Sequence, residues 1–169
     1  IEKMHRMGLT SWMLTGDNIN AAAKVASTIE VDQFWPGLLP EDKSVLINNG
    51  ILNGKRIAMV GDGVNDAPAL AQATVGIAMG VAGTDAALET ADITLMADDL
   101  SRLPRVIGLG RRTVRIIKQN ITLAVLIKFA IFLLVVPGWL TMWLAVAADM
   151  GSSLLVTLNG LRLLYCSDE

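Results

Sequence analysis

The stretch Gly61-Asp62-Gly63-Val64-Asn65-Asp66-Ala67-Pro68-Ala69-Leu70 decides the fold of this chain. It follows an apolar run, residues 57–60, which is typical of a buried strand. Two glycines let the backbone turn tightly, and Pro68 suits the first turn of a helix. An acidic surface turn is the simpler interpretation, but it explains neither the strand nor the Asn between the two acids. The pattern therefore predicts a strand, a functional turn and a helix.

The turn carries the carboxylates of Asp62 and Asp66, four positions apart. Carboxylate oxygens are hard ligands that suit Mg2+, and glycines allow a phosphoryl group to approach the backbone closely. We therefore expect phosphoryl chemistry that depends on Mg2+.

Residues 1–104 alternate between helical patterns and short apolar runs. We expect helices over 1–7, 19–29, 41–52, 67–73 and 84–90, and strands or extended segments over 9–14, 34–39, 57–60, 75–78 and 92–96. This alternation predicts an α/β fold, with a parallel sheet covered by helices on both faces.

Polar residues follow two of these strands. Thr15 and Asp17 follow one strand, and Asp62 and Asp66 follow another, so they are expected at the same edge of the sheet. Lys43 completes the set, because an ammonium group stabilises the charge on phosphoryl oxygens. Taken alone, Lys43 is more often a solvated helix lysine and Thr15 a plain cap or turn residue. The prediction therefore depends on the whole set.

Composition divides the chain of 169 residues into unlike halves, so the net charge of −2 says little. Basic residues gather over 102–118 without interleaved aromatics, and no nucleic-acid partner is expected. Cys166 is the single cysteine, which excludes an internal disulfide. The chain opens with Ile1 inside an apparent helix, and we expect a fragment of a longer protein.

The second half contains two apolar stretches, 119–136 and 139–161, separated by Pro137-Gly138. Each is long enough to cross a bilayer core of about 30 Å. The basic residues before the first stretch favour a hairpin with both ends in the cytoplasm. Two buried helices of a soluble protein are the alternative, which such low polarity disfavours.

Between Gln119 and Leu161 the only charged residues are Lys128 and Asp149. At 1.5 Å per residue they lie about 14 and 18 Å from the Pro137-Gly138 turn, near mid-membrane. Charges at that depth usually face a pathway, a bundle interior or each other. A purely structural ion pair is the alternative to a role in transport.

With Thr15-Gly16-Asp17-Asn18, Lys43 and the run from Gly61 to Asp66 in this order, the chain resembles the C-terminal part of a heavy-metal P-type ATPase. The resemblance covers essentially all residues. It implies a partial haloacid-dehalogenase-like phosphorylation domain (1–104), a basic cytoplasmic linker helix (105–118) and transmembrane helices over 119–136 and 139–164.

The resemblance also implies roles for the site residues. Thr15 and Lys43 would contact an aspartyl phosphate, and Asp62, with Asp66, would hold Mg2+. Asn65 and Asp66 would support the site. Gly16 would belong to the catalytic set, and Asp17 would lie near the hinge to a nucleotide-binding domain.

The spans resemble the zinc, cadmium and lead exporters, which share the patterns Asn120…Lys128 and Ala148-Asp149-Met150-Gly151. Copper pumps have Tyr-Asn in place of Ile127-Lys128 and Met in place of Asp149, and they remain the alternative. By resemblance, Asp149 would bind Zn2+, Cd2+ or Pb2+, and Lys128 would be its countercharge after release.

Several family features are absent from the sequence. They are the phosphorylated aspartate of Asp-Lys-Thr-Gly-Thr, the Cys-Pro-Cys metal motif, and the nucleotide-binding and actuator domains. We expect them upstream of Ile1, where most ATP contacts would also lie, so the fragment alone is expected to be inactive. The expected location is the plasma (inner) membrane, with the soluble half in the cytoplasm.

Two different functions also fit parts of the sequence. One is a membrane-tethered phosphatase of the same fold, which would need its own nucleophilic aspartate at the end of a first strand. The second is a non-catalytic pump remnant that acts as an interaction module.

Overall fold

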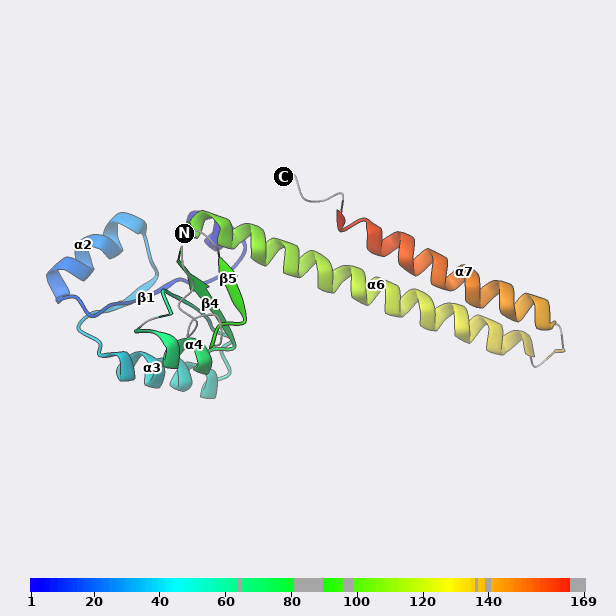
Figure 1. Ribbon diagram of the computed structural model, residues 1–169, viewed down its shortest axis with the longest axis horizontal. Coiled ribbons are helices and arrows are strands. Elements are labelled where there is room, and N and C mark those ends of the chain that lie inside the picture. Colours follow the sequence, from blue (N-terminus) through cyan, green and yellow to red (C-terminus); the bar gives the residue numbers. More distant parts are fainter. Residues whose placement is uncertain (64, 81–89, 96–98, 136, 139–140, 165–169) are drawn as a thin grey trace. The chain divides into compact units, whose positions relative to one another are not determined.

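The computed structural model describes residues 1–63, 65–80, 90–95, 99–135, 137–138 and 141–164. The chain separates into two compact units, Ile1–Pro104 and Arg105–Glu169 (Figure 1). The expected helix over 84–90 falls, except for Thr90, outside the described residues.

The first unit alternates helices and strands, as expected. Its helices are α1 (Glu2–Arg6), α2 (Ile19–Ile29), α3 (Pro40–Leu52) and α4 (Ala67–Gln72), and its strands are β1 (Trp12–Leu14), β2 (Gln33–Trp35), β3 (Ala58–Gly61), β4 (Val75–Met79) and β5 (Ile93–Leu95). Every strand pair is parallel, but the ladders form two sheets, β1-β2 and β3-β4-β5. The parallel arrangement is confirmed, whereas a single continuous sheet is not observed among the described residues.

Local capping explains where the helices begin. The Asn18 side chain accepts the backbone N–H of Ala21 (3.0 Å) at the start of α2. Asp42 accepts the backbone N–H of Leu39 (3.0 Å), with Pro40 in the first turn of α3. The first N–H groups of a helix lack a carbonyl partner within the helix, and these side-chain oxygens accept hydrogen bonds from them. Proline suits the first turn because it has no backbone N–H group that needs a partner.

The core of this unit joins α3 and α4 to strands β3 and β4. Its buried residues are Ile47, Met59, Ala69, Leu70 and Ala78. Gly76 lies against α4, because a Cβ there would be 2.7 Å from the carbonyl oxygen of Leu70. Tight packing of this kind holds the start of α4 in a fixed position relative to α3.

A polar cluster ties the N-terminal helix to the first sheet. The Asp32 carboxylate accepts the backbone N–H of Ser11 (2.6 Å) and its hydroxyl (2.9 Å), and it lies 3.0 Å from His5 Nε2. These hydrogen bonds from Ser11, together with His5, lower the pKa of Asp32 below its ordinary value of 3.8.

The second unit is a helical hairpin. The short helix η1 (Leu100–Arg102) and the first residues of α6 (Leu103–Val135) belong to the first unit, and residues 105–135 of the second unit form one unbroken helix. Helix α7 is Met142–Leu161. Gly138, at φ 77°, sits in the turn between them. The two helices run antiparallel (Figure 1). Both are long and apolar enough to cross a membrane, by length and composition.

Candidate functional site

The turn after β1 is held by its own side chains. Thr15 Oγ1 donates to Asp17 Oδ2 (3.0 Å) and accepts the backbone N–H of Asp17 (3.1 Å). The N–H groups of Gly37 and Leu38 donate to the carbonyls of Asp17 (2.8 Å) and Thr15 (3.0 Å). A Cβ on Gly16 would lie 3.4 Å from the carbonyl oxygen of Leu38, so the turn lies directly against the segment that leads into α3.

Helices α3 and α4 are joined by an ion pair. Lys43 Nζ, in the first turns of α3, donates to Asp66 Oδ1 at 2.6 Å. The side chains are only 15% and 14% exposed. Lys43 is therefore not a solvated surface lysine, as it would more often be when considered alone. A largely buried carboxylate of this kind depends on its cation partner.

Two glycines make room for Asp66. A Cβ on Gly61, the last residue of β3, would lie 2.8 Å from Asp66 Oδ2 and 2.9 Å from Asp66 Cβ. Gly63 has φ 77°, a conformation that side chains rarely adopt. The motif thus uses its glycines to bring the backbone of β3 against the carboxylate of Asp66.

The structure brings some of the expected site residues together. Lys43 is joined to Asp66 and Thr15 to Asp17, but no hydrogen bond or ion pair joins one pair to the other within the described ranges. Asn65 is exposed at the surface of the turn.

The described residues contain no cluster of three or more His, Cys, Asp or Glu side chains that could hold a metal ion. Mg2+ usually keeps several waters and binds one or two carboxylates together with substrate phosphates. The donor chemistry of Asp62 and Asp66 fits that pattern. These residues would hold Mg2+ only in part, with phosphate and water oxygens completing the shell.

In the second unit, amide side chains connect α6 to α7. Asn159 Nδ2 donates to Asn120 Oδ1 (2.8 Å), and Asn120 Nδ2 donates to the carbonyl of Val156 (3.4 Å). Arg162 Nη1 also donates to Asn159 Oδ1 (3.1 Å). We call Asn120 and Asn159 the asparagine clasp. Neither residue was expected to link the helices, although two amides in apolar helices are a visible signal.

The clasp fixes the register of Lys128 and Asp149. Lys128 lies eight residues beyond Asn120 towards the turn, and Asp149 lies seven residues from Val156 in the same direction. These offsets correspond to about 12 and 11 Å along antiparallel helices, so the two charges lie at nearly the same level. Both side chains are exposed in the hairpin, and the described residues include no ion pair between them.

Comparison with protein families and curated proteins identifies relatives of this chain. A family model described as haloacid dehalogenase-like hydrolase matches residues 1–74. A probable cadmium-transporting ATPase of Listeria monocytogenes is 54% identical over 169 residues, 99% of this chain and 24% of the relative. A cadmium-transporting ATPase of Staphylococcus aureus is 52% identical over 170 residues. The chain thus spans about a quarter of the length of the curated relatives it matches.

Other relatives are less similar. A copper-exporting P-type ATPase of Staphylococcus aureus is 44% identical over 163 residues. Among solved structures, a zinc-transporting PIB-type ATPase in the E2.Pi state matches with a TM-score of 0.90 and 45% identity, covering 97% of this chain and 27% of that protein. That match includes both the α/β unit and the helical hairpin, since it extends over nearly all of this chain.

Proposed function

We propose that this chain, which belongs to the heavy-metal branch of the P-type ATPases, forms the C-terminal part of an ATP-driven pump that exports Zn2+, Cd2+ or Pb2+. The observation that carries the proposal is the alignment of the whole chain with cadmium transporters at 52–54% identity. A copper exporter is less similar, at 44%. A copper-type pump is therefore not favoured.

The first unit would hold and stabilise the phosphoryl group. An aspartate upstream of Ile1 would take the γ-phosphate from ATP, which the upstream domains would mainly bind. The Lys43 ammonium would offset charge on the phosphoryl oxygens, and the Thr15 hydroxyl would donate to one of them. Mg2+, when bound at Asp62 and Asp66, supplies further charge neutralisation at the same oxygens. Asn65 would support this turn, Gly16 would belong to the catalytic set, and Asp17 would lie near the hinge to the nucleotide-binding domain.

The ion pair between Lys43 and Asp66 supports this assignment. It keeps the ammonium on a rigid helix, largely out of water, where a charge interacts more strongly than in solvent. When a phosphoryl group arrives, the ammonium would share its hydrogens between that group and Asp66.

The second unit would carry the metal through the membrane. The Asp149 carboxylate would be a ligand of the transported ion, since zinc accepts carboxylate oxygens, whereas Cu(I) prefers soft sulfur ligands. Lys128 would approach Asp149 once the metal has left. Their equal level in the hairpin supports this exchange of partners, because neither helix needs to slide for the two side chains to meet.

The location follows from the charge distribution. Basic residues gather before the apolar part of α6, and Arg162 follows α7, a pattern that keeps both ends of the hairpin on the cytoplasmic side. We place the first unit in the cytoplasm and the hairpin in the plasma (inner) membrane, with the upstream part of the polypeptide and the lipid bilayer as partners.

Replacement of Asp149 tests the transport role. In the complete pump, Asp149→Ala should reduce ATPase stimulation by Zn2+ and Cd2+ at least about tenfold, as expected for the loss of more than 1.4 kcal/mol of ion binding. The neighbouring variant Met150→Ala, at a residue that is 70% exposed, is the matched control and should keep its stimulation. Unchanged stimulation in Asp149→Ala would refute the role of Asp149 as a ligand.

A further inference from the structure

Helix α6 carries a group of basic residues before its apolar part. No Asp or Glu occurs between Leu100 and Ala148, while four basic residues lie within 111–118, immediately before the apolar part of the helix. We propose that one face of this region binds the phosphate headgroup of an anionic phospholipid. This inference depends on the proposed function only in requiring that α6 crosses a membrane.

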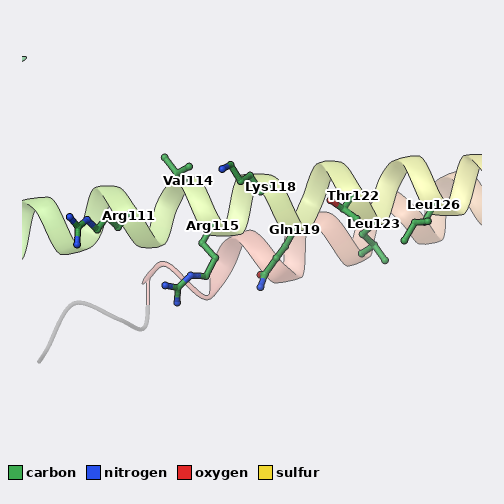
Figure 2. A pocket seen from close by; sticks show the side chains of 8 residues that line it. All are labelled: Arg111, Val114, Arg115, Lys118, Gln119, Thr122, Leu123 and Leu126. Carbon is green, nitrogen blue, oxygen red and sulfur yellow. The ribbon is translucent and has the colours of Figure 1, made fainter. Parts of the chain in front are cut away.

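A groove on α6 has the chemistry of such a ligand. Its volume is about 590 Å3, and its lining includes Arg111, Arg115, Lys118, Gln119, Leu123 and Leu126 (Figure 2). The cations occupy one end and the leucines the other. From Lys118 to Leu126 the helix rises by about 12 Å. Over this distance the lining of the groove changes from charged to apolar, as the chemistry of a phospholipid does from its headgroup to its acyl chain.

Most of the groove lies on the side of α6 that faces away from α7, and its residue Leu123 is half-buried at the edge nearer to α7. Asn120 marks the α7 side through its hydrogen bonds, and the half-buried residues Thr113, Ile116 and Ile127 follow the same side. At about 100° per residue, Arg115 and Lys118 lie about 140–200° around the helix from Asn120. Helix α7 therefore does not cover most of the groove.

Charge complementarity selects the occupant. Arg115 and Lys118 are exposed, and the described residues provide no ion-pair partner for either side chain. Basic residues next to the cytoplasmic end of a span are attracted to anionic lipids, and basic pockets at that level hold phosphate headgroups. Guanidinium groups match phosphate oxygens in pairs, and the leucines beyond give the acyl chain an apolar surface.

Lipid retention by the complete pump tests this site. The pump is reconstituted with equal amounts of phosphatidylglycerol and phosphatidylcholine, and retained lipids are counted by native mass spectrometry. The wild type should prefer phosphatidylglycerol. The variant Arg115→Gln/Lys118→Gln should lose about 30-fold of that preference, as expected for two cations near an anionic headgroup.

A matched variant removes the same charge from other faces of the helix. Arg105→Gln/Arg112→Gln should keep most of the preference, with a loss below about threefold. An equal loss in both variants would overturn the discrete site in favour of diffuse attraction. No preference in the wild type would also overturn it, as expected if another helix of the pump covers this face.

Two further measurements complete the test. One distinguishes a lipid headgroup from free phosphate as the ligand, and the other distinguishes lipid binding from metal transport. Excess inorganic phosphate should leave the retained lipid in place, and displacement would overturn the proposal by showing that the site takes free phosphate. Asp149→Ala should retain phosphatidylglycerol like the wild type, since lipid binding does not use the metal ligand. Failure of the lipid proposal is thus distinguishable from failure of the transport proposal.

Discussion

The two units contain the same pair of residue types in opposite situations. In the first unit, Lys43 and Asp66 are joined at 2.6 Å, and their side chains are 15% and 14% exposed. In the hairpin, Lys128 and Asp149 lie at one level, but both are exposed and the described residues show no ion pair between them. We call Lys43 and Asp66 the closed pair, because their side chains are in contact, and Lys128 and Asp149 the open combination, because they lie at one level without an ion pair between them among the described residues.

The difference follows from what positions each partner. Lys43 and Asp66 lie on α3 and at the start of α4, which share a core with β3 and β4, so their separation is set by close packing. The hairpin has two helices joined through the asparagine clasp, which sets their register but brings neither charged side chain to a partner within the described ranges. The closed pair suits the proposed phosphoryl site, where the cation stays in place, whereas the open combination suits the proposed transport site, where a metal ion binds and leaves.

The largest effect is expected from breaking the closed pair. Lys43→Met leaves Asp66 as an uncompensated, largely buried charge, and should lower the free energy of unfolding by about 3 kcal/mol. Phosphorylation of the complete pump from ATP should be lost as well. Thermal unfolding and phosphorylation of the purified pump measure the two consequences. Lys24→Met, at an exposed lysine of α2, is the control and should change neither.

A double variant sharpens this test. Lys43→Met/Asp66→Leu removes both charges and should be more stable than Lys43→Met, because replacing a buried ion pair with apolar side chains is often neutral. It should nevertheless remain inactive. A Lys43→Met protein as stable as the Lys24→Met control would contradict the importance of the closed pair.

A smaller effect is expected at Gly61. The Cβ of Gly61→Ala would meet the Asp66 side chain at 2.8–2.9 Å, and overpacking of this kind destabilises by about 2 kcal/mol. The displaced carboxylate would also loosen its bond to Lys43. Gly108→Ala is the control, since apart from its chain neighbours and the backbone of its own helix no described atom lies within 4 Å of a Cβ there, and alanine favours a helix.

The cause of that effect is separable by combination with Asp66→Gly, which removes both the carboxylate oxygen and the Cβ that would lie within 3 Å of the added methyl group. If the clash with Asp66 is responsible, adding Gly61→Ala to Asp66→Gly should lower the free energy of unfolding little further. If the two substitutions change the free energy of unfolding by fully additive amounts, Gly61 acts through something other than its contact with Asp66.

The sequence predicted the α/β class because its helices carry local signals. For α2 the predicted range, 19–29, matches the observed bounds, and Asn18 at its start is a capping residue that can be recognised without a structure. The division of the strands into two sheets was not predicted. Pairing between strands distant in sequence depends on tertiary packing, and single strands of three residues carry little information about it.

The candidate site was predicted as a set of residues rather than as a geometry. Motif spacing placed Lys43, Asp62 and Asp66 in one site, but nothing in the sequence fixes a bond of 2.6 Å between α3 and the start of α4. The asparagine clasp was missed for a related reason. Its residues are visible as amides in apolar helices, but their pairing requires the register of the hairpin, which depends on the turn near Gly138 and on side-chain packing.

The smallest effect is expected from weakening the asparagine clasp, which sets the levels of Lys128 and Asp149. Asn120→Ala removes both hydrogen bonds of Asn120 to α7, worth about 1 kcal/mol together. If the clasp keeps Lys128 and Asp149 level, the apparent affinity for Zn2+ in ATPase stimulation should fall about fivefold while the maximal rate is kept. Ile121→Ala, at the adjacent residue that is 59% exposed, should leave the affinity unchanged. An Asn120→Ala pump with wild-type affinity would mean that the register of the two charges is maintained by the rest of the membrane domain, and the open combination would then not depend on the hairpin alone.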